Sequence, residues 1–144
     1  MILFENFSDI HEICREHSIE NYTINTDGTI DVDGDVNLHY KELTKLPLKF
    51  RKVSGDFCCY TNRLTTLEGA PQSVGGYFDC RSNKLKTLEG APKSVLGSYF
   101  FYKNPLDVIR IMFPNNKEFL NANNEWDFFA GGSKIHKRIR IHII

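Results

Sequence analysis

A repeat with a short, fixed period constrains the fold of this chain more than any other feature of its sequence. Three evenly spaced rows start at Val53, Val74 and Val95, and each has Gly two residues later, Asn nine residues later and Leu eleven residues later. An upstream row from Val32 keeps the valine, the glycine and the leucines but has Lys41 in place of the asparagine. Self-similarity at a short fixed period is typical of proteins built from stacked coils. The sequence therefore predicts a solenoid of about four coils.

The residue pattern within one row indicates how each coil is built. Phe57 and Cys59 alternate with polar residues, which predicts a short strand with both side chains inward. Asn62 follows three residues later, and a buried amide can hydrogen-bond the turning backbone of adjacent coils. The return leg carries Pro71, which excludes a helix there. We expect one strand on one face of each coil, an extended segment on the other, and a stacked asparagine ladder.

The segments outside the repeats predict two caps. Residues 7–17 have the spacing of a short amphipathic helix, and residues 22–33 alternate around Asp27-Gly28 as a hairpin does. For residues 134–144 both a strand and a helix remain open. The predicted fold is mainly β with small α caps in a single domain, which comprises a helix and hairpin cap (1–31), a repeat solenoid (32–113) and a C-terminal α/β cap (114–144).

Composition places the chain among globular proteins. Hydrophobic residues make up 41% of the sequence, which is enough for a packed core. No apolar run approaches the ~20 residues that cross a bilayer, and the start has no basic segment typical of a secretory signal. The four cysteines have no metal-ligand spacing. We therefore expect a cytoplasmic protein with reduced thiols, among which Cys58 points outward and is the most reactive.

Charge is distributed unevenly along the chain. Residues 1–35 contain nine acids and one base, which gives −8, so the remaining residues must carry +8 to reach the net charge of zero. Such asymmetry is informative about partners rather than about fold. It allows a homo-oligomer in which the acidic N-terminal end of one copy meets the basic C-terminal end of another.

The repeat resembles a known family. The pattern Phe-x-Cys-x-x-Asn-x-Leu-x-x-Leu is similar to the leucine-rich repeat in a short form with little or no convex helix. The row from Val74, Val-Gly-Gly-Tyr-Phe-Asp-Cys-Arg-Ser-Asn-Lys-Leu, resembles more narrowly the leucine-rich-repeat-like proteins of tailed bacteriophages, over roughly residues 22–113. This resemblance implies a non-enzymatic binding protein inside an infected bacterium. It implies no particular partner.

The outward positions of the predicted strands form columns across the coils. One column is His39, Tyr60, Arg81 and Tyr102, the next is Asn37, Cys58, Asp79 and Phe100, and a third is Asp35, Asp56, Tyr77 and Ser98. Exposed Tyr, Phe and Arg are the types that anchor protein interfaces. We therefore expect a partner-binding face made of His39, Cys58, Tyr60, Tyr77, Asp79, Arg81, Phe100 and Tyr102. The alternative is that some of these aromatic side chains pack against each other or against the C-terminal cap.

No sequence motif indicates catalysis, a cofactor or a metal ion. The expected function is recognition of a bacterial host protein, with a defence component as one such partner. A basic patch in the tail supports two alternatives, a nucleic-acid-binding accessory protein or a self-associating structural protein. The residues of this patch are Lys134, Lys137, Arg138 and Arg140.

Overall fold

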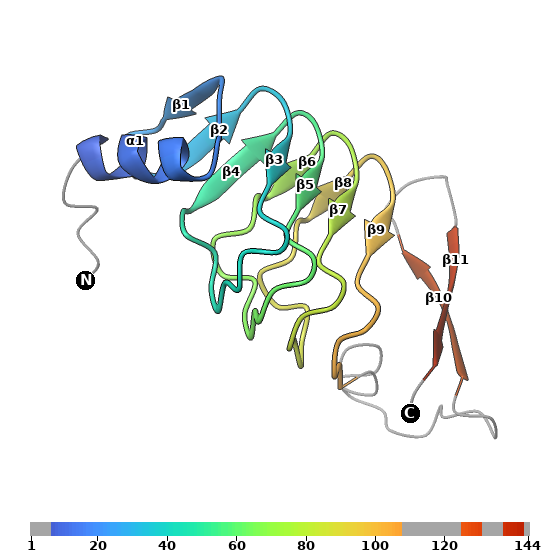
Figure 1. Cartoon of the computed structure of the whole chain (residues 1–144). Helices are drawn as coiled ribbons and strands as arrows, with labels where there is room; N and C mark the ends of the chain where they lie inside the picture. The colour runs from blue at the N-terminus through green and yellow to red at the C-terminus, as the bar shows by residue number, and fades with distance from the viewer. Residues whose placement is uncertain (1–6, 108–124, 131–136, 143–144) are drawn as a thin grey trace.

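The chain folds as a mainly β structure with one short helix. The structure is a computed structural model that describes residues 7–107, 125–130 and 137–142. Helix α1 (Phe7–Glu16) agrees with the predicted amphipathic segment, and Ile10 and Cys14 are its buried residues. Both belong to the same hydrophobic cluster as the coils that follow. The helix therefore packs on the first coil, alongside which it lies in Figure 1.

The predicted hairpin is present, but its turn differs from the expected one. Strands β1 (Tyr22–Ile24) and β2 (Ile30–Val32) pair antiparallel. Of the residues between them, Gly28 alone has positive φ, at 84°, and its N–H donates to the Asn25 carbonyl at 3.0 Å. This is a β-turn followed by a left-handed glycine, whereas the two-residue turn that we predicted needs positive φ at both central positions.

Each coil contains two short strands rather than the single strand that the sequence predicts. The valine of each row lies in one strand and the phenylalanine pattern in the next. The chain bends between the two near Gly55 and its equivalents, and the coils stack as in Figure 1. The strands are β3 (Val36–Asn37), β4 (Phe50–Val53), β5 (Phe57–Cys58), β6 (Ser73–Val74), β7 (Phe78–Asp79), β8 (Ser94–Val95) and β9 (Tyr99–Phe100).

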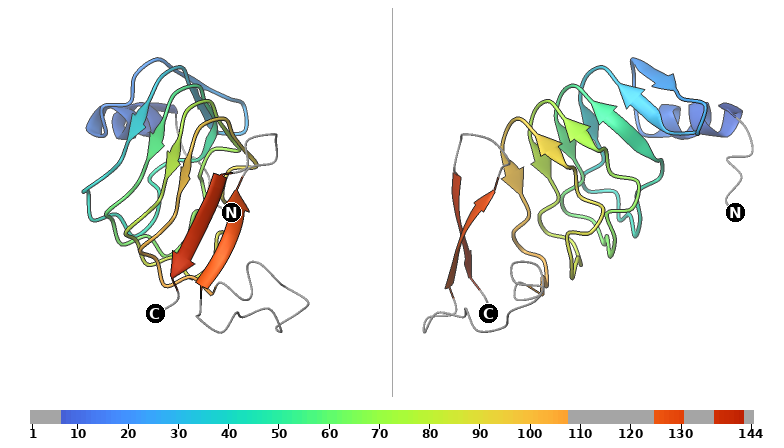
Figure 2. Two further views of the ribbon diagram at one scale, coloured as in Figure 1. Left: turned by 90° about the vertical axis from the view of Figure 1, so that its right-hand side faces the viewer. Right: turned by 180° about the vertical axis from the view of Figure 1, so that it is seen from behind.

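Two sheets result from this arrangement, and the second follows the sequence repeat strand by strand. One sheet has the order β1-β2-β4-β6-β8 and the other β3-β5-β7-β9. In the second sheet Val36 pairs with Phe57, which pairs with Phe78, which pairs with Tyr99, always in parallel. Three complete turns connect these four strands, and the end-on view in Figure 2 shows the coils nested behind one another. A solenoid-like stack is thus confirmed.

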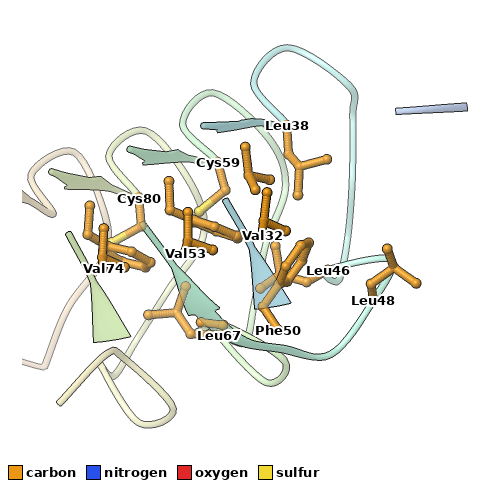
Figure 3. Close-up of a cluster of buried hydrophobic side chains, with 14 of the residues drawn as sticks. Val32, Leu38, Leu46, Leu48, Phe50, Val53, Cys59, Leu67, Val74 and Cys80 are labelled. Atoms are coloured by element: carbon orange, nitrogen blue, oxygen red, sulfur yellow. The ribbon is translucent and has the colours of Figure 1, made fainter. Parts of the chain in front are cut away.

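The core of the stack consists of ladders of equivalent residues. Phe57 and Phe78 are fully buried, with nearly parallel rings whose centroids are 5.6 Å apart. Cys59 and Cys80 are also fully buried, one coil apart, as free thiols. Figure 3 shows them pointing inward among Val53, Val74 and Leu67. The predicted inward positions of the repeat are therefore correct.

The asparagine ladder is present as predicted. The side-chain nitrogen of Asn83 donates to the carbonyls of Cys59 and Cys80, both at 3.0 Å, and its oxygen accepts from Leu64 N–H at 3.0 Å. Asn62 and Asn104 make the equivalent bonds one coil earlier and one coil later. Because each amide joins its own coil to the preceding one, the polar backbone of the turns is satisfied inside the protein.

Close contact at the bends requires glycine. Gly76 N–H donates to the Gly55 carbonyl at 2.9 Å, and a Cβ atom at Gly76 would lie 1.9 Å from the Asp56 carboxylate. That carboxylate accepts from Tyr77 N–H at 2.9 Å, and Asp35 accepts from Asp56 N–H at 2.8 Å in the coil before. Asp35 and Asp56 therefore bond successive coils together in addition to carrying charge.

A second hairpin follows the coils. Strands β10 (Glu125–Ala130) and β11 (Lys137–His142) pair antiparallel. Residues 137–142 are therefore a strand, which settles for these positions the choice between strand and helix. The rest of the predicted C-terminal cap lies outside the described residues. Within the described ranges, no helix has the length and apolar character needed to span a bilayer.

We expect Asn83→Ala to lower the free energy of unfolding by about 3 kcal/mol. The substitution leaves the Leu64 N–H buried without its acceptor and removes a donor from two carbonyls, and each unsatisfied buried group costs about 1–3 kcal/mol. Urea denaturation measures the loss. Lys84→Ala, at the exposed neighbouring position, is the control and should change stability by less than about 0.5 kcal/mol. Equal effects of the two substitutions would contradict the ladder's role.

A second stability prediction concerns backbone strain just before the ladder. Thr61 and Ser82 adopt left-handed φ values of 53° and 55° although neither is glycine, and this conformation is strained most for a β-branched residue. Thr61→Asn should raise the free energy of unfolding by about 1 kcal/mol, because asparagine tolerates this region better. Thr65→Asn, at a position without positive φ, should give no gain, and thermal denaturation compares the two.

Candidate functional site

The outer face of the β3-β5-β7-β9 sheet brings the predicted site residues together. His39, Tyr60, Arg81 and Tyr102 follow the strands at equivalent positions of successive coils, and we call these four residues the aromatic strip. The register that aligns Cys58 with Asp79, and Asp79 with Phe100, places a second column beside it. Side chains that lie one full repeat apart in the sequence are thereby neighbours on one surface.

Ring stacking orders the first half of the aromatic strip. The rings of His39 and Tyr60 are parallel to within 1°, with centroids 4.8 Å apart. Tyr40 packs edge-on against both, at 5.6 and 5.7 Å. The Nδ1 atom of His39 is buried and has no hydrogen-bond partner. The faces of the His39 and Tyr60 rings therefore lie against each other, and Tyr40 packs beside both.

Arg81 occupies the centre of the aromatic strip between two tyrosine rings. Its guanidinium carbon lies 4.8 Å from the centre of the Tyr60 ring and 5.5 Å from that of Tyr102, and it also donates a hydrogen bond to the Tyr102 hydroxyl. Cation–π contacts of this kind contribute roughly 0.5–1 kcal/mol each at exposed sites. The side chain of Arg81 is still 34% exposed, so a partner can reach it without unfolding the coil.

Asp79 holds the Arg81 side chain in position from the buried side of the face. One carboxylate oxygen lies 3.1 Å from Arg81 Nε, and the other accepts from Arg81 N–H at 3.2 Å. The Asp79 side chain is only 2% exposed. Burial raises the pKa of this carboxyl above its ordinary value, and the hydrogen bond and charge of Arg81 oppose that rise. Asp79 thus holds Arg81 in place and is itself covered.

The prediction that Cys58 is exposed and reactive is wrong. Cys58 is buried because Tyr77 of the next coil lies across it, and the Cys58 thiol donates to the Tyr77 hydroxyl at 3.6 Å. Burial raises the pKa of the thiol, which lowers its reactivity at neutral pH. The same hydrogen bond is the main cause that raises the pKa of Tyr77 to about 12. Cys58 and Asp79 therefore support the face from beneath and are not part of its accessible surface.

The accessible part of the face is aromatic. Tyr40, Tyr102 and Tyr77 are 71%, 48% and 36% exposed, and Phe100 is half-buried between Tyr77 and Tyr102. Sequence reasoning missed Tyr40, which follows the strip position His39 and has a left-handed φ of 54°. Its equivalents are Thr61, Ser82 and Lys103, so the repeat itself could have revealed a column at this position.

The basic patch of the tail is described only in part. Lys137, Arg138 and Arg140 lie in β11, where Arg138 pairs with Phe129 and Arg140 with Asp127 on β10. Lys134 lies outside the described residues. The role of this patch stays a prediction. Among the residues that the structure describes, no three His, Cys, Asp or Glu side chains gather as metal ligands would.

Comparison with known proteins returned no relative of this chain. No family model, curated protein or solved structure matches it.

We expect the ionisation of Asp79 to make stability depend on pH. Because the folded pKa is raised above the ordinary 3.8, this group favours the folded state most at low pH, and its contribution falls as pH rises through the folded pKa. The free energy of unfolding of the wild type minus that of Asp79→Asn should therefore decrease from about pH 4 to about pH 7. Urea denaturation across this range tests it. A difference that increased instead would mean that Arg81 outweighs burial.

Proposed function

We propose that this protein is a non-enzymatic, leucine-rich-repeat-like binding protein that recognises a protein partner with the aromatic strip. The observation that carries the proposal is Arg81, ordered between Tyr60 and Tyr102 and still partly exposed. Arginine and tyrosine are the side chains most enriched among residues that dominate binding energy. Because these side chains are already ordered before binding, complex formation loses less conformational entropy.

The packing of the strip favours a protein partner over the bases of a nucleic acid. Base recognition by stacking requires free aromatic faces. The Tyr60 ring has His39 on one side and Arg81 on the other, so its faces are occupied. The accessible groups of the face are the exposed tyrosine side chains and part of the Arg81 side chain, which suit hydrogen bonds and packing against protein side chains.

The family resemblance of the repeat supplies the biological setting of the proposal. In this setting the protein is encoded by a bacteriophage, acts in the host cytoplasm and binds a host protein, such as a defence component that it blocks. In this proposal, helix α1 with the β1–β2 hairpin forms the N-terminal cap of the repeats. The burial of Ile10 and Cys14 within the core cluster of the coils supports the N-terminal assignment.

Site-specific crosslinking tests this function. A photoreactive benzoylphenylalanine at position 102 should crosslink a discrete bacterial protein in a cell lysate. The same residue at Leu96, which is 73% exposed and adjoins β8 of the other sheet, should not. Crosslinking at both positions, or at neither, would contradict the assignment of the face.

Substitutions in the aromatic strip measure how much its residues contribute to the binding free energy. Arg81→Ala and Tyr102→Ala should each weaken binding of the crosslinked protein by tenfold or more, since central interface residues of these types each contribute more than ~1–2 kcal/mol. The buried residue of this coil is Phe101, so Tyr102→Ala leaves the core intact. Unchanged circular dichroism of Tyr102→Ala should accompany its loss of binding, whereas Arg81→Ala also removes the ion-pair partner of the buried Asp79 and should lower stability. Leu96→Ala is the matched control and should bind like the wild type.

A further inference from the structure

Two charged edges flank the aromatic strip. On the turn side, four exposed cations lie one to three residues after successive members of the strip, and we call Lys41, Arg63, Lys84 and Lys103 the basic edge. On the bend side, two carboxylates lie four residues before the first two members of the strip, and we call Asp35 and Asp56 the acidic edge. Arg63 of the basic edge is ion-paired with Glu42 at 3.1 Å, and both side chains are largely exposed. The face is therefore aromatic at its centre and oppositely charged at its two sides.

The dimensions of this face limit what can cover it. Three coil spacings of about 4.8 Å give the strip a length of ~14 Å, which equals about ten residues of α-helix. A helix with its side chains is ~10–12 Å wide, so it can cover the strip and place charged side chains at both edges. An extended segment turns only alternate side chains toward a surface and would meet fewer of these groups.

We infer that the face receives an amphipathic helix of the partner, with an acidic flank against the basic edge and a basic flank against the acidic edge. This inference rests on the proposed function and specifies its partner. The apolar stripe of the helix packs on Tyr40, Tyr102 and Phe100. Because the two edges differ in sign, a helix with one acidic and one basic flank binds in a single direction along the strip, and a helix with two like flanks faces repulsion at one edge.

Three synthetic helical peptides, each about 14 residues long and so able to span the strip, test this inference. All share one leucine stripe with a fluorescent label. The first has glutamates on one flank and lysines on the other, the second has glutamates on both, and the third has lysines on both. Fluorescence anisotropy with the full chain at low salt should give the first peptide an affinity at least about fivefold higher than either other peptide, since exposed charge pairs each contribute modestly. High salt should reduce the difference.

Charge reversal on the protein completes the test. Lys84→Glu combined with Lys103→Glu should weaken binding of the first peptide about tenfold and make the all-lysine peptide the strongest ligand. Both side chains are exposed, so the fold is retained, and circular dichroism verifies this. Equal binding of the three peptides, binding of none, or an unchanged order after charge reversal would overturn the inference. If crosslinking at position 102 still captures a protein while the peptides fail to bind, the inference of a helical partner is wrong, but the proposed binding face is retained.

Discussion

The structure depends on how the turning backbone of each coil satisfies its hydrogen bonds. A coil with only two strands, each of two to four residues, leaves many N–H and C=O groups outside regular pairing, and burying them unpaired is costly. The side chains of Asn62, Asn83 and Asn104 solve this by donating to two carbonyls each and accepting from an N–H of the preceding coil. Each coil is thus stable only against its neighbour, which makes the stack the folding unit.

The same coupling sets the conformation of residues that face the solvent. The residues just before the ladder positions, Thr61, Ser82 and Lys103, are forced into left-handed φ. The N–H groups of Thr61 and Ser82 still pair with the next coil. Strain of this kind persists where the surroundings determine the backbone. The strip residues Tyr60 and Arg81 immediately precede these positions, so the ladder also fixes where their side chains emerge. The hydrogen bonds of the core therefore also determine the positions of side chains on the surface.

Sequence reasoning could find the features that recur at equivalent positions of every coil. It could not find contacts between non-equivalent residues of neighbouring coils. The register, the inward Phe57 and Cys59 and the asparagine ladder follow from a fixed period with a known side-chain alternation. The second strand of each coil was missed because its sequence does not alternate between apolar and polar residues, as in Phe50-Arg-Lys-Val53. The burial of Cys58 was missed because Tyr77, which covers it, comes from the next coil. A side chain that points outward from a strand can still be buried when a large side chain of the next coil covers it.

The buried Asp79 beneath the aromatic strip explains how Arg81 is held at the centre of the strip. Arg81 would be free to sample many rotamers if Asp79 did not engage both its Nε and its backbone N–H. Asp79 in turn is buried under the side chains of its own surface, where an unpaired carboxylate would be costly. Charge, burial and ring stacking therefore depend on one another across neighbouring coils. Under the proposed function, a partner meets a surface whose side chains are already ordered, and we propose that selectivity comes from the charged edges on either side of it.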